Sequence, residues 1–224
     1  MRTKHAINNI ALQATTLVSG IILYFFLTPY IVKALGNEVY GINQLLLQTI
    51  GYFGIAEMGI GISLSVLLYK ELVHNHIENI NALLSAAQRI YMIIGVSIAA
   101  AGLLFSFFFN DLFSIPAGYA LQTQIAFLLY IASAASTYFL SVPATLLNTA
   151  QKGYKTYIYQ LLRPFLTYCA YIVLVYYGFS IIGIAAASFT VSLWYVIGTS
   201  RKAYAEFPWI NIWQSNKNYE ILKP

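Results

Sequence analysis

Hydrophobic residues fill six long stretches of the 224-residue chain, and polar residues collect in the short gaps between them. The stretches cover residues 8–35, 40–69, 81–109, 120–148, 157–177 and 181–200, and a more polar tail follows at 201–224. Each has at least the roughly 20 residues with which an α-helix crosses a bilayer core. None alternates strictly between apolar and polar positions, as the strands of a membrane barrel do. The pattern therefore predicts an all-α, polytopic membrane protein, with six transmembrane helices in one domain at residues 1–200.

Composition agrees with a chain that lies in lipid rather than in water. Charged residues make up 8% of the chain and hydrophobic residues 59%, whereas a soluble domain carries about a quarter charged residues. The net charge of +5 is spread over segment ends in ones and twos, so it does not indicate nucleic-acid binding. The lone cysteine, Cys169, has no partner for an internal disulfide or a metal site and is interpreted as a packing residue. Nothing in the sequence indicates a cofactor.

The positive charges indicate how the spans are oriented. With the N-terminus inside, ten of the twelve lysines and arginines lie on the inner side of the membrane. These ten are Arg2, Lys4, Lys70, Arg89, Lys152, Lys155, Arg201, Lys202, Lys217 and Lys223. Lys33 lies outside, and Arg163 lies within the fifth span. Such a bias is the positive-inside rule, so we expect both termini in the cytoplasm.

Two inner segments carry most of the remaining polar residues. In the gap at residues 70–80, His74 and His76 form a pair without a third metal ligand. The gap is therefore interpreted as a solvated turn, followed by an asparagine cap on the third span. The tail at 201–224 interleaves Trp209 and Trp213 with charged residues, which predicts a cytoplasmic amphipathic segment on the inner leaflet.

Glu57 is the residue whose burial in lipid costs most. It lies between Ala56 and Met58 in the second span, about 27 Å along a helix that starts at Tyr40. An acid at this depth costs a few kcal/mol, so we expect Glu57 to face the interior of the bundle. Two roles stay open: a site that couples transport to a proton or cation, or a carboxyl group that braces helix contacts.

Arg163 lies two turns inside the fifth span and precedes Pro164. Its long side chain can extend to the cytoplasmic headgroups. Alternatively, it faces a central cavity and binds a phosphate or diphosphate group with its fork of donors. A pairing with Glu57 also stays open, because the sequence does not say which helix faces meet.

The second span offers a set of polar side chains for a substrate. Gln44, Gln48 and Tyr52 follow one another at four-residue spacing and are predicted to form a polar wall for a sugar-sized substrate. Glu57 lies about 140° further around the helix than Tyr52, so it joins this wall only if the helix is broken. The nearby glycines, Gly51, Gly54, Gly59 and Gly61, either permit such a break or allow close helix packing.

Tyrosine and proline add further candidates inside the spans. Five tyrosines lie deep enough either to stack on sugar rings or to pack in the core, namely Tyr24, Tyr130, Tyr138, Tyr168 and Tyr171. Pro29, Pro143 and Pro164 lie within a few turns of span ends, where they predict kinks, with or without a role in gating.

Several short motifs, in this order and spacing, resemble one transporter family. They are Pro29, Leu35-Gly36, Tyr40-Gly41, Gly51, Glu57-Met58-Gly59-Ile60-Gly61, residues 79–85, Gln151-Lys152-Gly153 and Phe207-Pro208-Trp209. Together they resemble the start of the bacterial polysaccharide flippases of the multidrug/oligosaccharidyl-lipid/polysaccharide exporter superfamily. The resemblance covers the whole chain.

The resemblance implies a location, a partner and a function. Members of the family have two six-helix lobes around a central cavity and move undecaprenyl-diphosphate-linked oligosaccharides across the bacterial inner membrane by alternating access. With six spans, this chain is expected to be the N-terminal lobe, and a second six-helix lobe is its expected partner. Family members often carry an acid near the position of Glu57. Arg163 alone represents their cationic cavity lining, and this puts recognition of the substrate charge in question.

Other functions stay open beside this one. A drug/cation antiporter of the same superfamily and a non-transporting structural fragment are the alternatives. A membrane enzyme is not expected, because the outer gaps are short and offer only Glu38 and Asp111 as acids.

The predicted orientation can be tested with reporter fusions. A reporter that is active only outside the cytoplasm, fused after Phe109, should be active, and a cytoplasm-active reporter fused after Gln151 should be active too. The reverse pattern would contradict the orientation.

Overall fold

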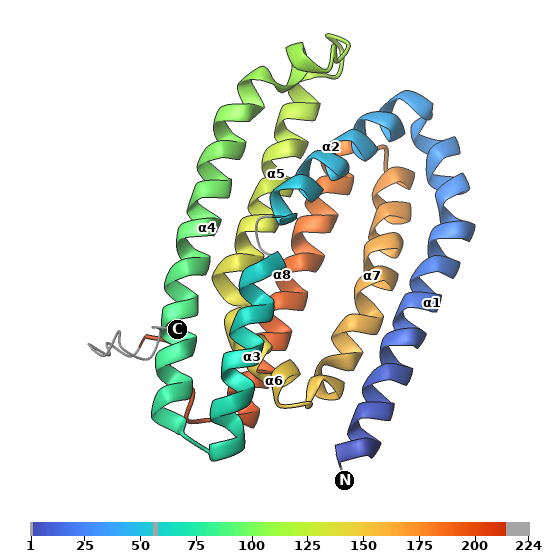
Figure 1. Cartoon of the computed structure of the whole chain (residues 1–224). Coiled ribbons are helices and arrows are strands. Elements are labelled where there is room, and N and C mark those ends of the chain that lie inside the picture. The colour runs from blue at the N-terminus through green and yellow to red at the C-terminus, as the bar shows by residue number, and fades with distance from the viewer. Residues whose placement is uncertain (1, 56–57, 214–224) are drawn as a thin grey trace.

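The computed structural model describes residues 2–55 and 58–213, and everything described is helix or connecting loop (Figure 1). Eight α-helices and one short 3₁₀ helix make up this part of the chain. They are α1 (Arg2–Leu35), α2 (Asn37–Ile55), α3 (Met58–His74), α4 (Ile77–Leu112), α5 (Ala120–Leu140), α6 (Val142–Thr149), η1 (Gly153–Thr156), α7 (Tyr157–Tyr176) and α8 (Ile181–Glu206). The all-α prediction is confirmed.

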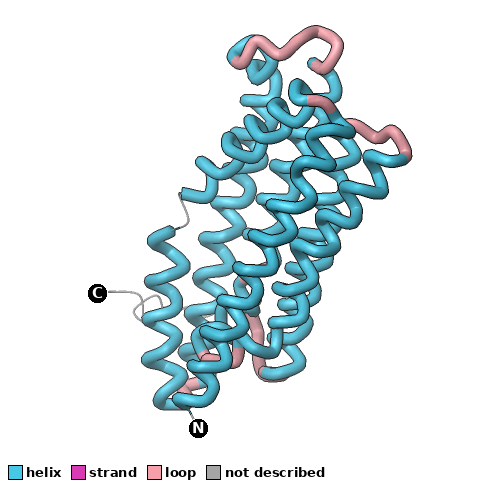
Figure 2. The backbone as a smooth tube through the Cα atoms, turned by 90° about the vertical axis from the view of Figure 1, so that its right-hand side faces the viewer, coloured by secondary structure: helices cyan, strands magenta, loops and turns pink. Residues whose placement is uncertain are grey.

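The long helices run side by side in one bundle, and the chain turns at its two ends (Figures 1 and 2). Five helices of the described chain are long and apolar enough to cross a membrane. The second predicted span, at residues 40–69, is divided between α2 and α3, whose segments Asn37–Gly54 and Gly59–His74 are inclined by 47°. The described chain therefore has the architecture of a polytopic helical membrane protein, with five candidate spans, or six if α2 and α3 together form one.

Glycines lie on both sides of the division between α2 and α3. A methyl group on Gly51, Gly54 or Gly59 would meet no atom within 4 Å. Only on Gly61 would it touch a neighbour, the Tyr91 hydroxyl at 3.3 Å. Of the two roles that the sequence left open for these glycines, close packing applies to Gly61 alone. The others lower the helix-forming tendency of the segment.

The fourth span is also divided, because Pro143 lies at the start of α6. Proline has no N–H, so the carbonyl of Phe139, four residues earlier, lacks its helical donor. The side-chain amide of Gln88 on α4 donates to this carbonyl at 2.9 Å. The hydroxyl of Ser200 on α8 donates to the next carbonyl, that of Leu140. Two neighbouring helices thus satisfy the backbone at the break, as lipid requires.

Pro29 and Pro164 behave differently from Pro143. Both lie inside α-helices that continue past them, α1 and α7. The kink predicted at Pro143 is therefore a full break between two helices, whereas no break accompanies Pro29 or Pro164.

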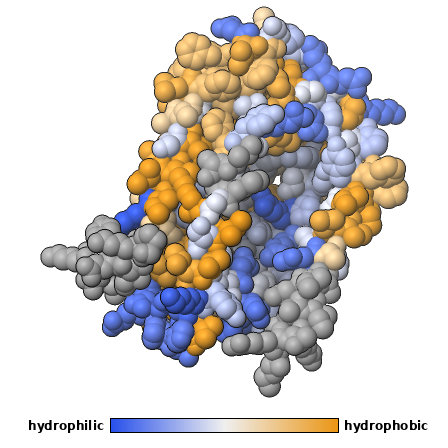
Figure 3. Space-filling view, in the orientation of Figure 1, coloured by the Kyte–Doolittle hydropathy of each residue, from blue (hydrophilic) through white to orange (hydrophobic). Residues whose placement is uncertain are grey.

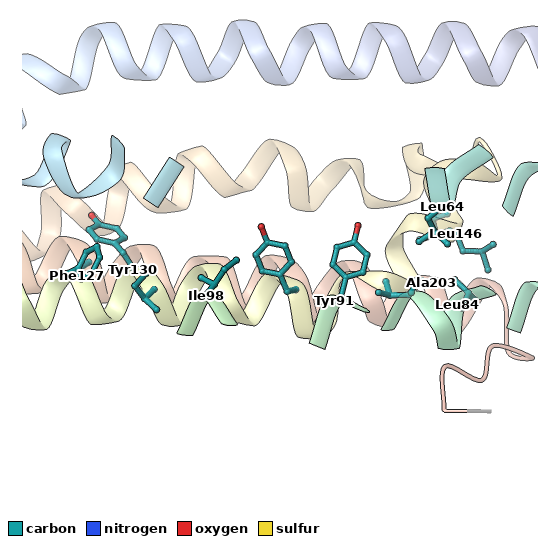
Figure 4. Close-up of a cluster of buried hydrophobic side chains, with 14 of the residues drawn as sticks. Leu64, Leu84, Tyr91, Ile98, Phe127, Tyr130, Leu146 and Ala203 are labelled. Carbon is teal, nitrogen blue, oxygen red and sulfur yellow. The ribbon is translucent and has the colours of Figure 1, made fainter. Parts of the chain in front are cut away.

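The core lies where α4, α5 and α8 pack together, and small residues let the helices approach closely. Figure 4 shows part of the buried cluster, including Tyr91, Ile98 and Phe127. A methyl group on Gly102 of α4 would lie 2.5 Å from Ile131 of α5. One on Gly198 of α8 would collide with the Tyr159 ring of α7. Because lipid gives helices no hydrophobic drive to associate, such close packing is a main source of bundle stability.

The turn at residues 75–76 differs from the prediction in one respect. The helix α4 begins at Ile77 after His76, and no side chain caps it, so the predicted asparagine cap is wrong. Asn79 instead donates to the carboxylate of Glu71 at 2.9 Å, and His76 Nδ1 lies 3.0 Å from the same oxygen. Within the described residues no group of three potential ligands could hold a metal ion.

The chain after α8 folds back against the bundle. The helix α8 continues past residue 200 to Glu206, and the following segment packs on α4. The Asn81 amide donates to the carbonyl of Trp209 at 3.0 Å and accepts from the N–H of Asn211 at 2.9 Å. This pair of hydrogen bonds holds the first part of the predicted amphipathic tail on the protein. Lys217 and Lys223 lie outside the described residues.

A salt-bridge cluster fixes the end of α8. Glu206 accepts from Lys152 at 2.6 Å and also from Lys155, and the Lys152 ammonium lies 4.8 Å from the centre of the Phe207 ring. Lys152 and Lys155, two of the basic residues predicted on the inner side, therefore connect the η1 region to α8.

The capping of the Phe139 carbonyl generates a prediction. Gln88→Leu should lower the free energy of unfolding by about 1–2 kcal/mol, the scale of a hydrogen bond between membrane helices. In a Pro143→Ala background the cost should be smaller, because the introduced alanine can supply a backbone N–H to the same carbonyl. Unfolding titrations of the four proteins in a double-mutant cycle measure the difference. Equal costs in both backgrounds would contradict this role of Gln88.

Candidate functional site

A cavity of about 540 Å³, lined by polar and apolar residues, lies between α1, α2, α5, α7 and α8. Four of these helices are candidate membrane spans, and α2 is half of the divided one. The space-filling view shows the molecule hollowed near its centre, with hydrophilic residues inside the hollow (Figure 3). Tyrosines, asparagine, glutamine, serines, threonines and one arginine line it beside a few apolar residues. A cavity of this size falls in the range of about 300–1,000 Å³ that is typical of small-molecule sites.

Arg163 lies on the wall of this cavity. It is about 9 Å along α7 from Tyr157, and its guanidinium carbon lies 4.8 Å from the centre of the Tyr195 ring. A guanidinium in this position gains a cation–π contact with the ring. Among the described lining residues it is the only charged one. Arg163 is thus both a lining residue and exposed, and its predicted role in phosphate binding stays a prediction.

Hydrogen bonds between tyrosines and small polar residues join the cavity walls. The Tyr130 hydroxyl on α5 donates to Asn43 Oδ1 on α2 at 2.7 Å. The hydroxyls of Tyr171 on α7 and Ser188 on α8 lie 2.5 Å apart. These contacts link four different helices across the cavity and set its shape.

Four of the five deep tyrosines lie at the cavity. Tyr24, Tyr130, Tyr168 and Tyr171 line it. Tyr138 instead packs in the core, where its ring lies 5.9 Å from that of Tyr91. The sequence left two locations open for these tyrosines, the cavity and the core. Four of them line the cavity, and Tyr138 packs in the core.

The three residues of the predicted polar wall on α2 separate. Gln44 lines the cavity and donates to the Tyr40 hydroxyl at 2.5 Å. Gln48 is exposed and is not among the lining residues, and Tyr52 is 72% exposed. Four residues advance a helix by about 400°, so each step turns the side chain by about 40° away from the cavity. Substrate binding by Gln48 and Tyr52 stays a prediction.

Glu57, the predicted coupling residue, lies outside the described residues. Its suggested pairing with Arg163 therefore stays a prediction as well.

Sequence reasoning missed several lining residues, which are Thr28, Asn43, Ser133, Thr137, Thr167, Ser188 and Ser192. Most of these small polar residues lie within largely apolar segments, and alone each carries little signal. In pairs they are more informative: Ser133 with Thr137, and Ser188 with Ser192, repeat at four-residue spacing. Such spacing places both members on one face of a helix, and in lipid this face turns toward protein.

Comparison of the chain with known family models, curated proteins and solved structures finds no match. The resemblance to polysaccharide flippases therefore rests on the sequence motifs alone.

The polar lining predicts that the cavity holds water. In a Cys169→Ser background, which has no cysteine, Ser188→Cys and Thr167→Cys should react readily with a small water-soluble maleimide. Ile131→Cys, in the core, and Val96→Cys, on the exposed surface of α4, should react much more slowly, because neither lines the cavity. Rates of labelling in proteoliposomes measure this. Equal rates at all four positions would contradict a water-filled cavity.

Proposed function

We propose that this chain is a transporter lobe that moves a lipid-linked, diphosphate-bearing oligosaccharide across the bacterial inner membrane by alternating access. The observation that carries the proposal is the position of Arg163 on the wall of a cavity that polar and apolar residues of the helical bundle line together. An arginine within a membrane span is costly and is usually retained for function. The order of the sequence motifs supports the same family of transporters.

The charge of the cavity favours an anionic substrate. Its described lining carries the guanidinium of Arg163 and no carboxylate. Phosphate oxygens match the planar fork of donors on an arginine. A site for a cationic drug would be expected to present carboxylates instead, so the flippase is favoured over a drug/cation antiporter.

The remaining lining suits the uncharged part of the substrate. Hydroxyl and amide groups, which both donate and accept hydrogen bonds, match the hydroxyls of sugars. Asn43, Gln44, Tyr40 and Tyr130 present such groups on α2 and α5. In this proposal the diphosphate binds Arg163, and the sugars occupy the side of the cavity near α2.

Transport by this mechanism needs a second wall for the cavity. We propose that a second six-helix lobe supplies it and that the two lobes rock against each other around the bound substrate. The bilayer is the other partner, since the lipid tail of the substrate remains in it during transport.

The role of Arg163 can be measured in proteoliposomes that contain the complete transporter and a fluorescent short-chain polyprenyl-diphosphate sugar. Arg163→Ala should slow translocation about 10- to 100-fold, because hydrogen bonds to a charged group contribute about 1.5–3 kcal/mol. Arg163→Lys should retain part of the rate, since it keeps the charge but loses the fork.

Arg201→Ala is the matched control, because Arg201 is an exposed arginine at the end of α8 and does not line the cavity. It should transport at the rate of the unmodified protein. Unchanged transport in Arg163→Ala would exclude the proposed role of the cavity.

A further inference from the structure

A second, smaller cavity lies beside the first, toward the end of the bundle where the N-terminus lies (Figure 1). It has a volume of about 260 Å³ and is formed by α1, α6, η1 and α7. Its lining residues are Leu12, Gln13, Asn148, Gly153, Tyr154, Tyr157 and Gln160. Three side-chain amides and two tyrosines thus face a space just below the roughly 300 Å³ at which small-molecule sites begin.

The local structure keeps this cavity open and its polar groups in place. The Gln160 amide donates to the Thr156 hydroxyl at 3.1 Å, which fixes the side chain at the start of α7. A methyl group on Gly153 would lie 2.8 Å from Asn148 Oδ1, so a larger residue here would require the Asn148 side chain to shift. The glycine therefore allows the Asn148 side chain to remain in the wall.

The lining of this cavity, within the described residues, carries no charged residue. The lysines nearest in the sequence, Lys152 and Lys155, bind Glu206 and are not part of the lining. A phosphate or a metal ion would find no charged partner there. Amides and tyrosines instead offer donors and acceptors together with flat apolar rings, which suits a ligand that carries many hydroxyl groups.

The two cavities share one face of α7. Tyr157 and Gln160 line the smaller cavity, and Arg163, Thr167 and Tyr171 line the larger one. At 100° per residue these five side chains lie within about 120° of the helix circumference. One continuous polar stripe therefore runs from the end of the bundle into the central cavity.

We propose that the smaller cavity is an entry site that binds one uncharged sugar residue of a membrane-anchored glycolipid before the ligand reaches the central cavity. This inference rests on the proposed function, which supplies the sugar-bearing substrate. The site receives the sugar at the cytoplasmic end of the stripe, and Arg163 then receives the diphosphate one turn further along α7.

The binding test uses protection of a cysteine at the edge of the site. Leu12→Cys is made in the Cys169→Ser background, and the protein is placed in lipid nanodiscs free of sugar-headed detergent. Dodecyl maltoside, a neutral sugar-headed amphiphile, should slow maleimide labelling of this cysteine. Adding Gln160→Leu should raise the concentration needed about tenfold, as expected for the loss of hydrogen bonds worth about 1.4 kcal/mol. Gln124→Leu, a change on α5 outside both cavities, is the matched control and should leave protection unchanged.

Three further probes define the ligand class. Dodecyl phosphate and dodecylphosphocholine, which lack a sugar, should protect poorly, and protection equal to that by the maltoside would overturn the sugar assignment. Free maltose should need a much higher concentration than the maltoside, and equal potency would overturn the membrane-anchored ligand. No protection by dodecyl maltoside at all would overturn the site itself.

These outcomes are separable from those of the transport assay, because protection is measured without translocation. If Arg163→Ala leaves the transport rate unchanged while dodecyl maltoside still protects the cysteine, the proposed function is wrong but the sugar site stands. Retained transport without protection would remove only the entry site.

Discussion

The structure depends on one constraint: inside a bilayer, every backbone N–H and C=O group must find its partner within the protein. The division of the fourth span at Pro143 shows how the chain meets it. The carbonyls of Phe139 and Leu140, released by the break, accept hydrogen bonds from Gln88 and Ser200 on the two flanking helices. Gln88 and Ser200 are polar residues in apolar helices, and each is explained by the free carbonyl group that it bonds on the neighbouring helix.

The same constraint sorts the other polar side chains. Several that do not cap backbone groups lie at the cavity and bond to each other there, as Tyr130 does to Asn43. The cavity therefore keeps these polar groups away from lipid, and it also offers them to a polar ligand. Rigid packing around glycines such as Gly102 and Gly198 fixes the helices that carry these groups.

Charged residues are few inside the bundle and more frequent at its end. The salt bridges of the described chain lie near one end of the bundle, where Glu206 binds Lys152 and Lys155 and where His76 meets Glu71. Within the cavity the described lining keeps a single charge, on Arg163, supported by the Tyr195 ring. A lone cation on a neutral polar wall can distinguish an anionic group from its uncharged extension, and this is the property that the proposed transport of a diphosphate-linked sugar requires.

The sequence by itself determined that the chain is helical and that its long apolar segments suit lipid, because hydrophobic length and the cost of unsatisfied backbone groups act locally along the chain. It also singled out Arg163, Gln44 and four of the cavity tyrosines, since polar residues in apolar runs are visible without a structure. Only the tertiary structure decided which of these share a space. It separated Tyr138 from Tyr130, turned Gln48 and Tyr52 away from the cavity, and gave Gln88 a partner 51 residues away. Such pairings follow from how helices pack, and packing depends on contacts between residues that are distant in the chain.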